Sequence, residues 1–174
     1  MSTSVSLYDS FLCKETRAKK QQQLIKKYAT PLITIKAHMP KELRCNMYVN
    51  EIIEQAYLSV KDTLSQHEFT CIGNDEHKSN VGEERYLAVQ CRSASELKKF
   101  MMAIENTHPL GQLMDLNVMN REGKTISRGS CELSARKCII CDCPAPECAK
   151  KHQHSLADLD LKIKQILETF MVIS

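Results

Sequence analysis

Apolar side chains recur every three or four residues in four stretches of the chain, which is the spacing of helices that pack by one face. These stretches cover residues 6–29, 41–66, 93–108 and 155–170. Shorter apolar or alternating runs predict strands at residues 31–37, 68–71, 85–91, 113–119 and 125–128. The polar segment 73–82 begins and ends with glycine, which predicts a loop.

The predicted elements between residues 31 and 128 follow the order βαββαβ, with one added hairpin strand. This order predicts an α+β fold of the ferredoxin-like class, with two helices covering one face of the sheet. A chain of 174 residues suits a single domain, residues 1–174. We expect it to contain a basic N-terminal helix (6–29), the α+β core (31–128), and a Cys-rich loop with a C-terminal helix (136–174).

The strand at 113–119 carries the first candidate chemistry. Side chains alternate across a strand, so its apolar residues face the core while Asp115 and Asn117 face away. A carboxylate and an amide at this spacing suit a Mg²⁺ ion that holds phosphates, because Mg²⁺ takes oxygen ligands and only one or two carboxylates from a protein. The alternative is the solvated outer face of an ordinary antiparallel strand.

Candidate phosphate ligands follow the same strand. Arg121, Arg128 and Arg136 come soon after Asp115, and guanidinium groups bind phosphates through paired hydrogen bonds. Together with the carboxylate they predict a polyphosphate site, although arginines after a hairpin are usually solvated. His108 is a candidate phosphate ligand or proton carrier, or it only closes the helix before the next residue, a proline.

The N-terminal helix is cationic in its middle, from Arg17 to Gln23. Such a segment is either a solvated helix face or an arm whose Arg17 meets an anion, for example a polyphosphate or an acidic partner. The sequence leaves both alternatives open.

Soft metal ligands cluster near the C-terminus at Cys138, Cys141, Cys148 and His154. A CxxC turn with a third cysteine and a histidine can complete a tetrahedral structural zinc site. Cys143 and His152 are competing ligands, and the alternative is a packed loop of reduced cysteines.

Composition excludes several classes of function. The net charge is only +3 and the chain has no Trp, so a nucleic-acid partner is not expected. No apolar run approaches the roughly 18 residues of a membrane span, and the N-terminus lacks the apolar segment of a signal peptide. We therefore expect a cytoplasmic protein, where cysteines stay reduced. The glycine motifs of dinucleotide and P-loop cradles are also missing.

Several motifs together resemble one family. Thr107-His-Pro-Leu-Gly-Gln-Leu-Met-Asp-Leu-Asn-Val118 resembles its HPLGRLxDxDV block, and Ser127-Arg128 resembles its LSR step. Three segments near the C-terminus, Arg136-Lys-Cys-Ile-Ile-Cys141, Cys148-Ala and His154-Ser-Leu, resemble its RRCLLC…CAR…H block. Near the N-terminus, Arg17, Lys20 and Gln21 resemble its RxxRQ motif. The segment Pro31-Leu-Ile resembles its PL[VI] motif. The motifs follow one another along nearly the whole chain in the order expected for one family. Together they resemble the CitX family of apo-citrate lyase phosphoribosyl-dephospho-CoA transferases, also called citrate lyase holo-acyl-carrier-protein synthases.

The resemblance implies a transferase. The family moves the phosphoribosyl-dephospho-CoA group from 2'-(5''-triphosphoribosyl)-3'-dephospho-CoA to a serine of the citrate lyase acyl carrier protein, the gamma subunit, and releases pyrophosphate. Two departures from the family pattern matter. Asn117 stands where the family usually has Asp, which removes a charge from the metal pair, and Lys20 replaces an Arg, which removes a bidentate group.

Two other functions remain open. One is a non-catalytic, zinc-stabilised module that docks on a lyase complex. The other is the same transfer to another carrier, such as that of malonate decarboxylase.

Overall fold

The computed structural model describes residues 6–174, which form a mixed α/β fold. The strands are β1 (Leu32–Ala37), β2 (Thr70–Ser79), β3 (Gly82–Gln90), β4 (Met114–Met119) and β5 (Thr125–Ile126). The helices are α1 (Leu7–Tyr28), α2 (Tyr48–Gln66), α3 (Ala94–Thr107), α4 (Ala145–Lys150) and α5 (Leu156–Ile173). Three short 3₁₀ turns span Lys41–Leu43, Gly111–Leu113 and Gly129–Cys131.

The five strands make one antiparallel sheet in the order β2-β3-β1-β4-β5. β1 lies between β3 and β4, with Ile33 opposite Leu87 on one side and Val118 on the other. The prediction of a mixed fold around an antiparallel sheet is therefore confirmed.

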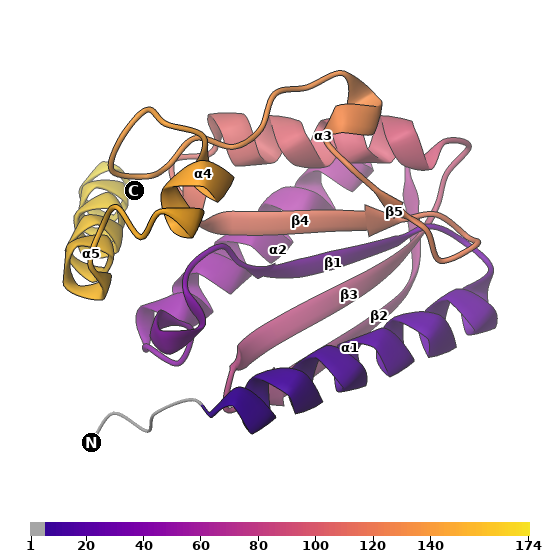
Figure 1. Cartoon of the computed structure of the whole chain (residues 1–174). Helices are drawn as coiled ribbons and strands as arrows, with labels where there is room; N and C mark the ends of the chain where they lie inside the picture. Colours follow the sequence, from indigo (N-terminus) through magenta and orange to yellow (C-terminus); the bar gives the residue numbers. More distant parts are fainter. Residues whose placement is uncertain (1–5) are drawn as a thin grey trace.

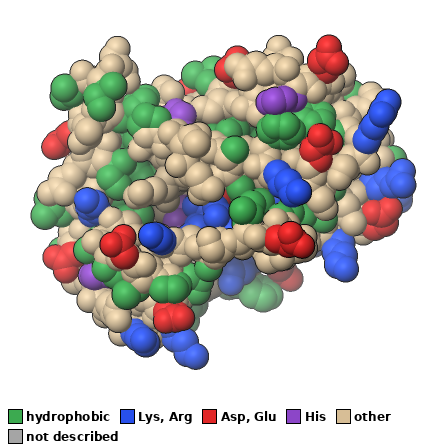
Figure 2. Space-filling model, turned by 90° about the horizontal axis from the view of Figure 1, so that it is seen from above, with side chains coloured by type: hydrophobic (Ala, Val, Ile, Leu, Met, Phe, Trp, Pro, Cys, Tyr) green, Lys and Arg blue, Asp and Glu red, His purple; other side chains and the backbone are tan. Residues whose placement is uncertain are grey.

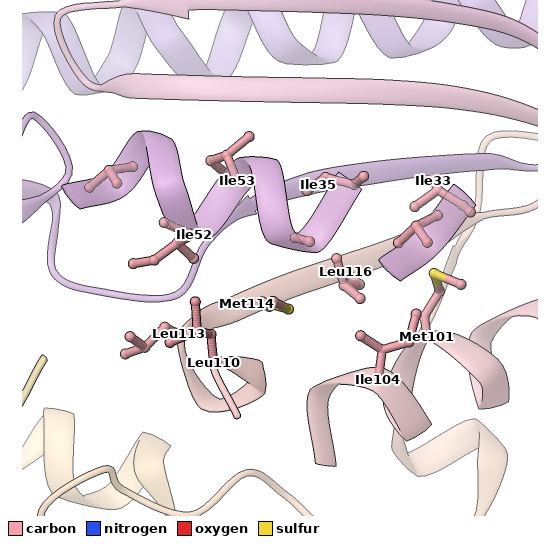
Figure 3. Close-up of a cluster of buried hydrophobic side chains, with 14 of the residues drawn as sticks. Ile33, Ile35, Ile52, Ile53, Met101, Ile104, Leu110, Leu113, Met114 and Leu116 are labelled. Atoms are coloured by element: carbon pink, nitrogen blue, oxygen red, sulfur yellow. The ribbon is translucent and has the colours of Figure 1, made fainter. Parts of the chain in front are cut away.

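The helices cover the two faces of the sheet unequally (Figure 1). α2 and α3 pack on one face and bury the main core, in which their isoleucines and methionines meet the apolar side chains of β1 and β4 (Figure 3). α1 packs on the opposite face against a smaller cluster of buried residues, Leu24, Leu32, Tyr86 and Ala88. Beside Asp115 and Asn117 of β4, this second face is approached by the chain that follows β5, including α4.

Side-chain caps fix the starts of three helices. Ser6 and Ser155 form capping boxes with Asp9 and Asp158, and the Ser93 side chain accepts a hydrogen bond from the Glu96 amide. Each cap satisfies a backbone N–H that has no partner within its helix.

Two sequence predictions about local structure are wrong. Residues 73–82 form most of β2 and its hairpin to β3, not a loop. β2 is an edge strand with mostly exposed side chains, so it lacks the apolar alternation that identifies a half-buried strand. The second helix begins at Tyr48, after a 3₁₀ turn, and not near residue 41. Met47, which the sequence placed on its apolar face, lies before the helix and is 92% exposed.

Candidate active site

A cavity of about 1110 Å³ opens on the sheet face beside β4. Asp115 and Asn117 lie on its wall. Both are partly exposed, whereas the alternate residues of β4 are buried on the side of α2 and α3. Figure 2 shows this side of the molecule from above, with Lys, Arg and His side chains gathered within the hollow. The carboxylate therefore faces away from the main core, toward a space large enough for a ligand.

The edge of β4 is completed by charged side chains in place of a strand. β5 pairs with β4 only at Val118 and Met119, so the edge is open at Leu116. Lys98 Nζ donates to the Leu116 carbonyl (2.9 Å), and the Leu116 amide donates to Glu105 Oε1 (2.8 Å). Both charged residues come from one face of α3, two turns apart, and each is only 4% exposed.

Glu105 holds two arginines at the cavity wall. Arg128 donates to Glu105 Oε2 and Arg136 donates to Oε1. Arg136 also approaches Asp115, with Nη2 at 3.7 Å from Oδ1. The two guanidinium groups line the cavity with side chains 18% and 17% exposed. A buried carboxylate thus fixes both cations before any ligand arrives, which is the arrangement that binds an anion without reorganisation.

Gly111 allows the helix carrying Glu105 to pack closely against the chain that leads into β4. A Cβ at position 111 would lie 2.3 Å from the Glu105 carbonyl oxygen, so a side chain does not fit there. The glycine of the HPLG segment therefore serves the placement of Glu105.

The charges around Asp115 set its protonation state. Burial opposes ionisation, but Lys36, Arg136 and His38 outweigh it, so the pKa of Asp115 lies below its usual value. Lys36 Nζ lies 3.3 Å from Asp115 Oδ2. Conversely, burial lowers the pKa of Lys98, although Glu105 and Asp115 favour its charged form.

His38 is a cavity residue that the sequence did not identify. It follows β1, its amide donates to the Leu113 carbonyl (2.8 Å), and its side chain lines the cavity. Burial, and then the charge of Arg136, lower the pKa of His38 to about 4, while Asp115 opposes the shift. The imidazole is therefore neutral at physiological pH.

Three sequence candidates lie away from this cavity. Arg17 is on α1 and binds Glu84, including an Nε–Oε1 hydrogen bond of 2.8 Å. Arg121 is in the hairpin, with its side chain 73% exposed and paired with Glu122. His108 ends α3, where its Nδ1 accepts from the Leu110 amide (3.0 Å) and burial lowers its pKa. The structure brings together Asp115, Asn117, Arg128 and Arg136 from the predicted set.

Lys98 and Glu105 carried a signal that the sequence analysis did not use. Both fall on the same helical face as Met101 and Met102, which are fully buried. Charged residues are rarely buried unless they are paired. A lysine and a glutamate seven residues apart within an apolar stripe therefore indicate buried partners elsewhere in the chain.

The predicted metal ligands converge in space. The ligand atoms of Cys138, Cys141, Cys148 and His154 all lie within 4.8 Å of one another. Cys138 Sγ is 3.5 Å from Cys148 Sγ, and His154 Nε2 is 3.3 Å from Cys141 Sγ. Around a tetrahedral zinc ion with Zn–S bonds of about 2.3 Å, sulfur atoms lie about 3.8 Å apart. This Cys/His cluster can therefore hold a metal, and it does not include the competing Cys143.

The Cys/His cluster also borders the cavity. Cys138, Cys148 and His154 contribute to the cavity lining. The backbone carbonyl of Arg136 accepts from the Ala145 amide (2.7 Å), within the loop that carries the cluster. The same loop thus presents both the metal ligands and one of the two arginines.

Comparison with known proteins identifies the family of the chain. Residues 5–170 match the CitX family, described as apo-citrate lyase phosphoribosyl-dephospho-CoA transferase. The chain belongs to the CitX family. A Vibrio cholerae protein named "Probable apo-citrate lyase phosphoribosyl-dephospho-CoA transferase" is 32% identical over 167 residues, which cover 96% of this chain and 94% of that protein. A Citrobacter koseri protein with the same name, without "probable", is 26% identical and covered over 94% and 89% of the two chains.

One further relative is a longer protein. The Haemophilus influenzae "Protein CitXG" is 28% identical over 166 residues, which are 95% of this chain but only 36% of that protein. The CitX-family sequence therefore also occurs as part of a larger chain. Among the described residues of the present chain, no helix is both long and apolar enough to cross a membrane.

Proposed function

We propose that this CitX-family protein transfers a phosphoribosyl-dephospho-CoA group from 2'-(5''-triphosphoribosyl)-3'-dephospho-CoA to a serine of the citrate lyase acyl carrier protein, with release of pyrophosphate. Family membership supports the reaction. The observation that carries the proposal for the site is the pair Arg128 and Arg136, held by the buried Glu105 beside Asp115 on the wall of a large cavity.

The proposed reaction requires an exchange at one phosphorus atom. The serine oxygen of the carrier forms a bond to the α-phosphorus of the triphosphate, the bond from that phosphorus to the departing pyrophosphate breaks, and the hydroxyl proton passes to solvent. Phosphoryl transfer depends mainly on positioning and on neutralising charge. Arg128 and Arg136 serve both purposes, because Glu105 fixes them in place and both side chains line the cavity.

Asp115 and Asn117 are the residues that would hold Mg²⁺. The donor set of one carboxylate and one amide oxygen fits an ion that takes its other ligands from phosphates and water. When bound, Mg²⁺ would neutralise phosphate charge. Lys36 and Arg136 already lie beside Asp115, so these two residues would also neutralise part of the phosphate charge. Asn117 carries no charge of its own.

We assign the Cys/His cluster a structural zinc ion, because two CxxC thiols, a third thiol and an imidazole within 4.8 Å suit a closed tetrahedral site. The purified protein should contain about one zinc per chain by elemental analysis, and a Cys141→Ser variant should lose it. Cys143 is an exposed cysteine of the same loop outside the group, so Cys143→Ser is the matched control. Equal zinc content in both variants would contradict the assignment. Thiolate ligands persist in reducing compartments, which supports action in the cytoplasm.

For the core we propose the ferredoxin-like class. The strand order β2-β3-β1-β4, with α2 following β1 and α3 following β3, supports it. An experimental structure with a different strand order would overturn this assignment.

The transfer is tested by mass spectrometry of the apo-carrier after incubation with donor and protein. We expect the mass of the carrier to rise by that of the prosthetic group, with one equivalent of pyrophosphate released. An Asp115→Ala variant should fold but lose most of the transfer, whereas Asp62→Ala, which removes an exposed carboxylate on α2, should retain it. If the wild-type protein does not modify the carrier, the alternative of a non-catalytic docking module is favoured. If it modifies only another carrier, the same transfer stands with a different protein substrate.

A further inference from the structure

The polar cluster at the edge of β4 contains more positive than negative charge. Its cations are Lys36, Lys98, Arg128 and Arg136, and its carboxylates are Glu105 and Asp115. Three of the four cations line the cavity, Lys36 being the exception. An excess of buried positive charge beside an open space is unfavourable unless an anion enters that space.

Lys98 is the least compensated member of this cluster. Within the described part of the chain, its single side-chain hydrogen bond goes to the neutral Leu116 carbonyl (2.9 Å), although an ammonium group has three N–H donors. Among residues 6–174, no carboxylate oxygen lies within 4.0 Å of its Nζ, whereas both arginines bind Glu105. At 4% exposure, little water is available to replace the missing partners, yet the side chain borders the cavity.

We propose that Lys98 is a third phosphate-binding residue, and that its two remaining N–H groups bind the donor phosphates that leave as pyrophosphate. This inference rests on the proposed function for the identity of the donor. The chemistry suits lysine, which binds phosphate as a compact point charge, alongside the bidentate arginines. The departing pyrophosphate gains negative charge as its bond to the α-phosphorus breaks, so an ammonium group placed there favours the transition state over the bound donor.

The alternative is a purely structural role, in which Lys98 only satisfies the Leu116 carbonyl. A structural lysine would not respond to a soluble anion. Inorganic pyrophosphate separates the two roles, because it is the smallest ligand that the proposed subsite accepts, and its binding requires neither the CoA donor nor the carrier.

The experiment is isothermal titration of the full chain with inorganic pyrophosphate, without donor or carrier. We expect Lys98→Met to weaken binding at least tenfold relative to the wild type, since hydrogen bonds to charged groups are strong. Lys99 is the next residue of α3 and is exposed, so Lys99→Met is the matched control and should bind within about twofold of the wild type. Equal binding by the wild type and the Lys98→Met variant would overturn the proposal.

A second measurement keeps the test valid if the Lys98→Met variant fails to fold. In wild-type protein labelled with ¹⁵N at lysine Nζ, the Lys98 signal should shift as pyrophosphate saturates the site, while the Lys99 signal should not. An unchanged Lys98 signal at saturation would overturn the proposal without any mutation.

Failure of this inference differs from failure of the proposed function. If the wild type modifies the carrier but Lys98 does not affect pyrophosphate binding, the transfer stands and the Lys98 assignment falls. If Lys98-dependent pyrophosphate binding is measured but the carrier is never modified, the anion subsite stands and the transferase proposal falls. With both intact, Lys98→Met should lower kcat more than it raises KM for the donor, because the leaving group gains its charge during the reaction.

Discussion

Two halves of the same sheet face handle buried charge in opposite ways. Under α1, Arg17 binds Glu84, which also accepts from the Tyr86 hydroxyl (2.6 Å), and Lys20 pairs with Asp75 at 3.1 Å. Arg17 and Lys20 in this closed half thus each have a carboxylate partner. Beside β4, cations outnumber carboxylates and a cavity adjoins them.

The difference shows how a structural charge cluster can be distinguished from a binding site. Burial favours the protonated form of Glu84, but hydrogen bonds from Arg17 and Tyr86 outweigh it and lower its pKa. This cluster is complete without a ligand. The open half is incomplete in the same sense, and its missing negative charge is what a polyphosphate supplies.

The largest expected effect comes from removing a cation of the open half. Arg136→Ala should lower carrier modification by roughly 10²- to 10³-fold, the usual loss when one preorganised donor to transition-state charge is removed. The measurement is kcat/KM for the donor, corrected for the folded fraction. Arg136→Lys keeps the charge and should lose less. Wild-type kcat/KM in the alanine variant would show that the open half does not bind the donor.

Removing a cation of the closed half should affect stability and leave catalysis intact. Arg17→Met leaves Glu84 buried without its partner, which we expect to cost about 2–3 kcal/mol of unfolding free energy, near the lower limit for buried pairs because Arg17 retains some exposure. Urea unfolding measures the loss. The double variant Arg17→Met/Glu84→Gln should recover part of it, because the unpaired charge is gone. If the Arg17→Met protein folds but cannot modify the carrier, α1 contributes to the active site after all.

The two halves should also differ in pH dependence, through His38. Its folded-state pKa of about 4 lies below its ordinary value near 6.5. The unfolded chain therefore binds a proton more readily than the folded protein. The contribution of His38 is fully present above about pH 6.5 and is lost as the pH falls toward 4. We expect a loss of about 2 kcal/mol after allowance for the partial exposure of the ring.

The check on His38 is unfolding free energy measured between pH 7 and pH 4.5 in the wild type and in a His38→Leu variant. Between these two pH values the variant should lose about 2 kcal/mol less unfolding free energy than the wild type. Parallel slopes in the wild type and the His38→Leu variant would show that protonation of His38 does not oppose folding.

Local sequence patterns predicted most of the elements. Strand alternation placed Asp115 and Asn117 on the face away from the core, and the spacing of soft ligands predicted the four residues that converge in the Cys/His cluster. These features depend on residues that lie within about 20 positions of one another in the chain, so the periodicity and spacing of the sequence are enough to predict them. Only the start of the edge strand β2 was predicted, within residues 68–71, because most side chains in the rest of the strand are exposed and give no apolar alternation.

The partners of buried charges could not be read in the same way. Glu105 meets Arg128 and Arg136 across 23 and 31 residues, and Arg17 meets Glu84 across 67. No period encodes which carboxylate a given arginine will meet after folding. The sequence therefore offered four arginines as candidate phosphate ligands, and the structure separates them into two cavity residues, one paired under α1 and one in solvent.

The smallest expected effect sharpens that separation. Arg121 and Arg128 are seven residues apart, and both follow Asp115. Arg121 is exposed, and within residues 6–174 its only carboxylate partner is the adjacent Glu122, at 3.1 Å. Exposed pairs contribute little, so Arg121→Ala should change the unfolding free energy by less than about 0.5 kcal/mol and carrier modification by less than about twofold. Arg128→Ala, measured beside it, should instead lose most of the transfer. If both variants lost transfer equally, the hairpin would have to reach the donor, and the cavity beside β4 would be only part of the site.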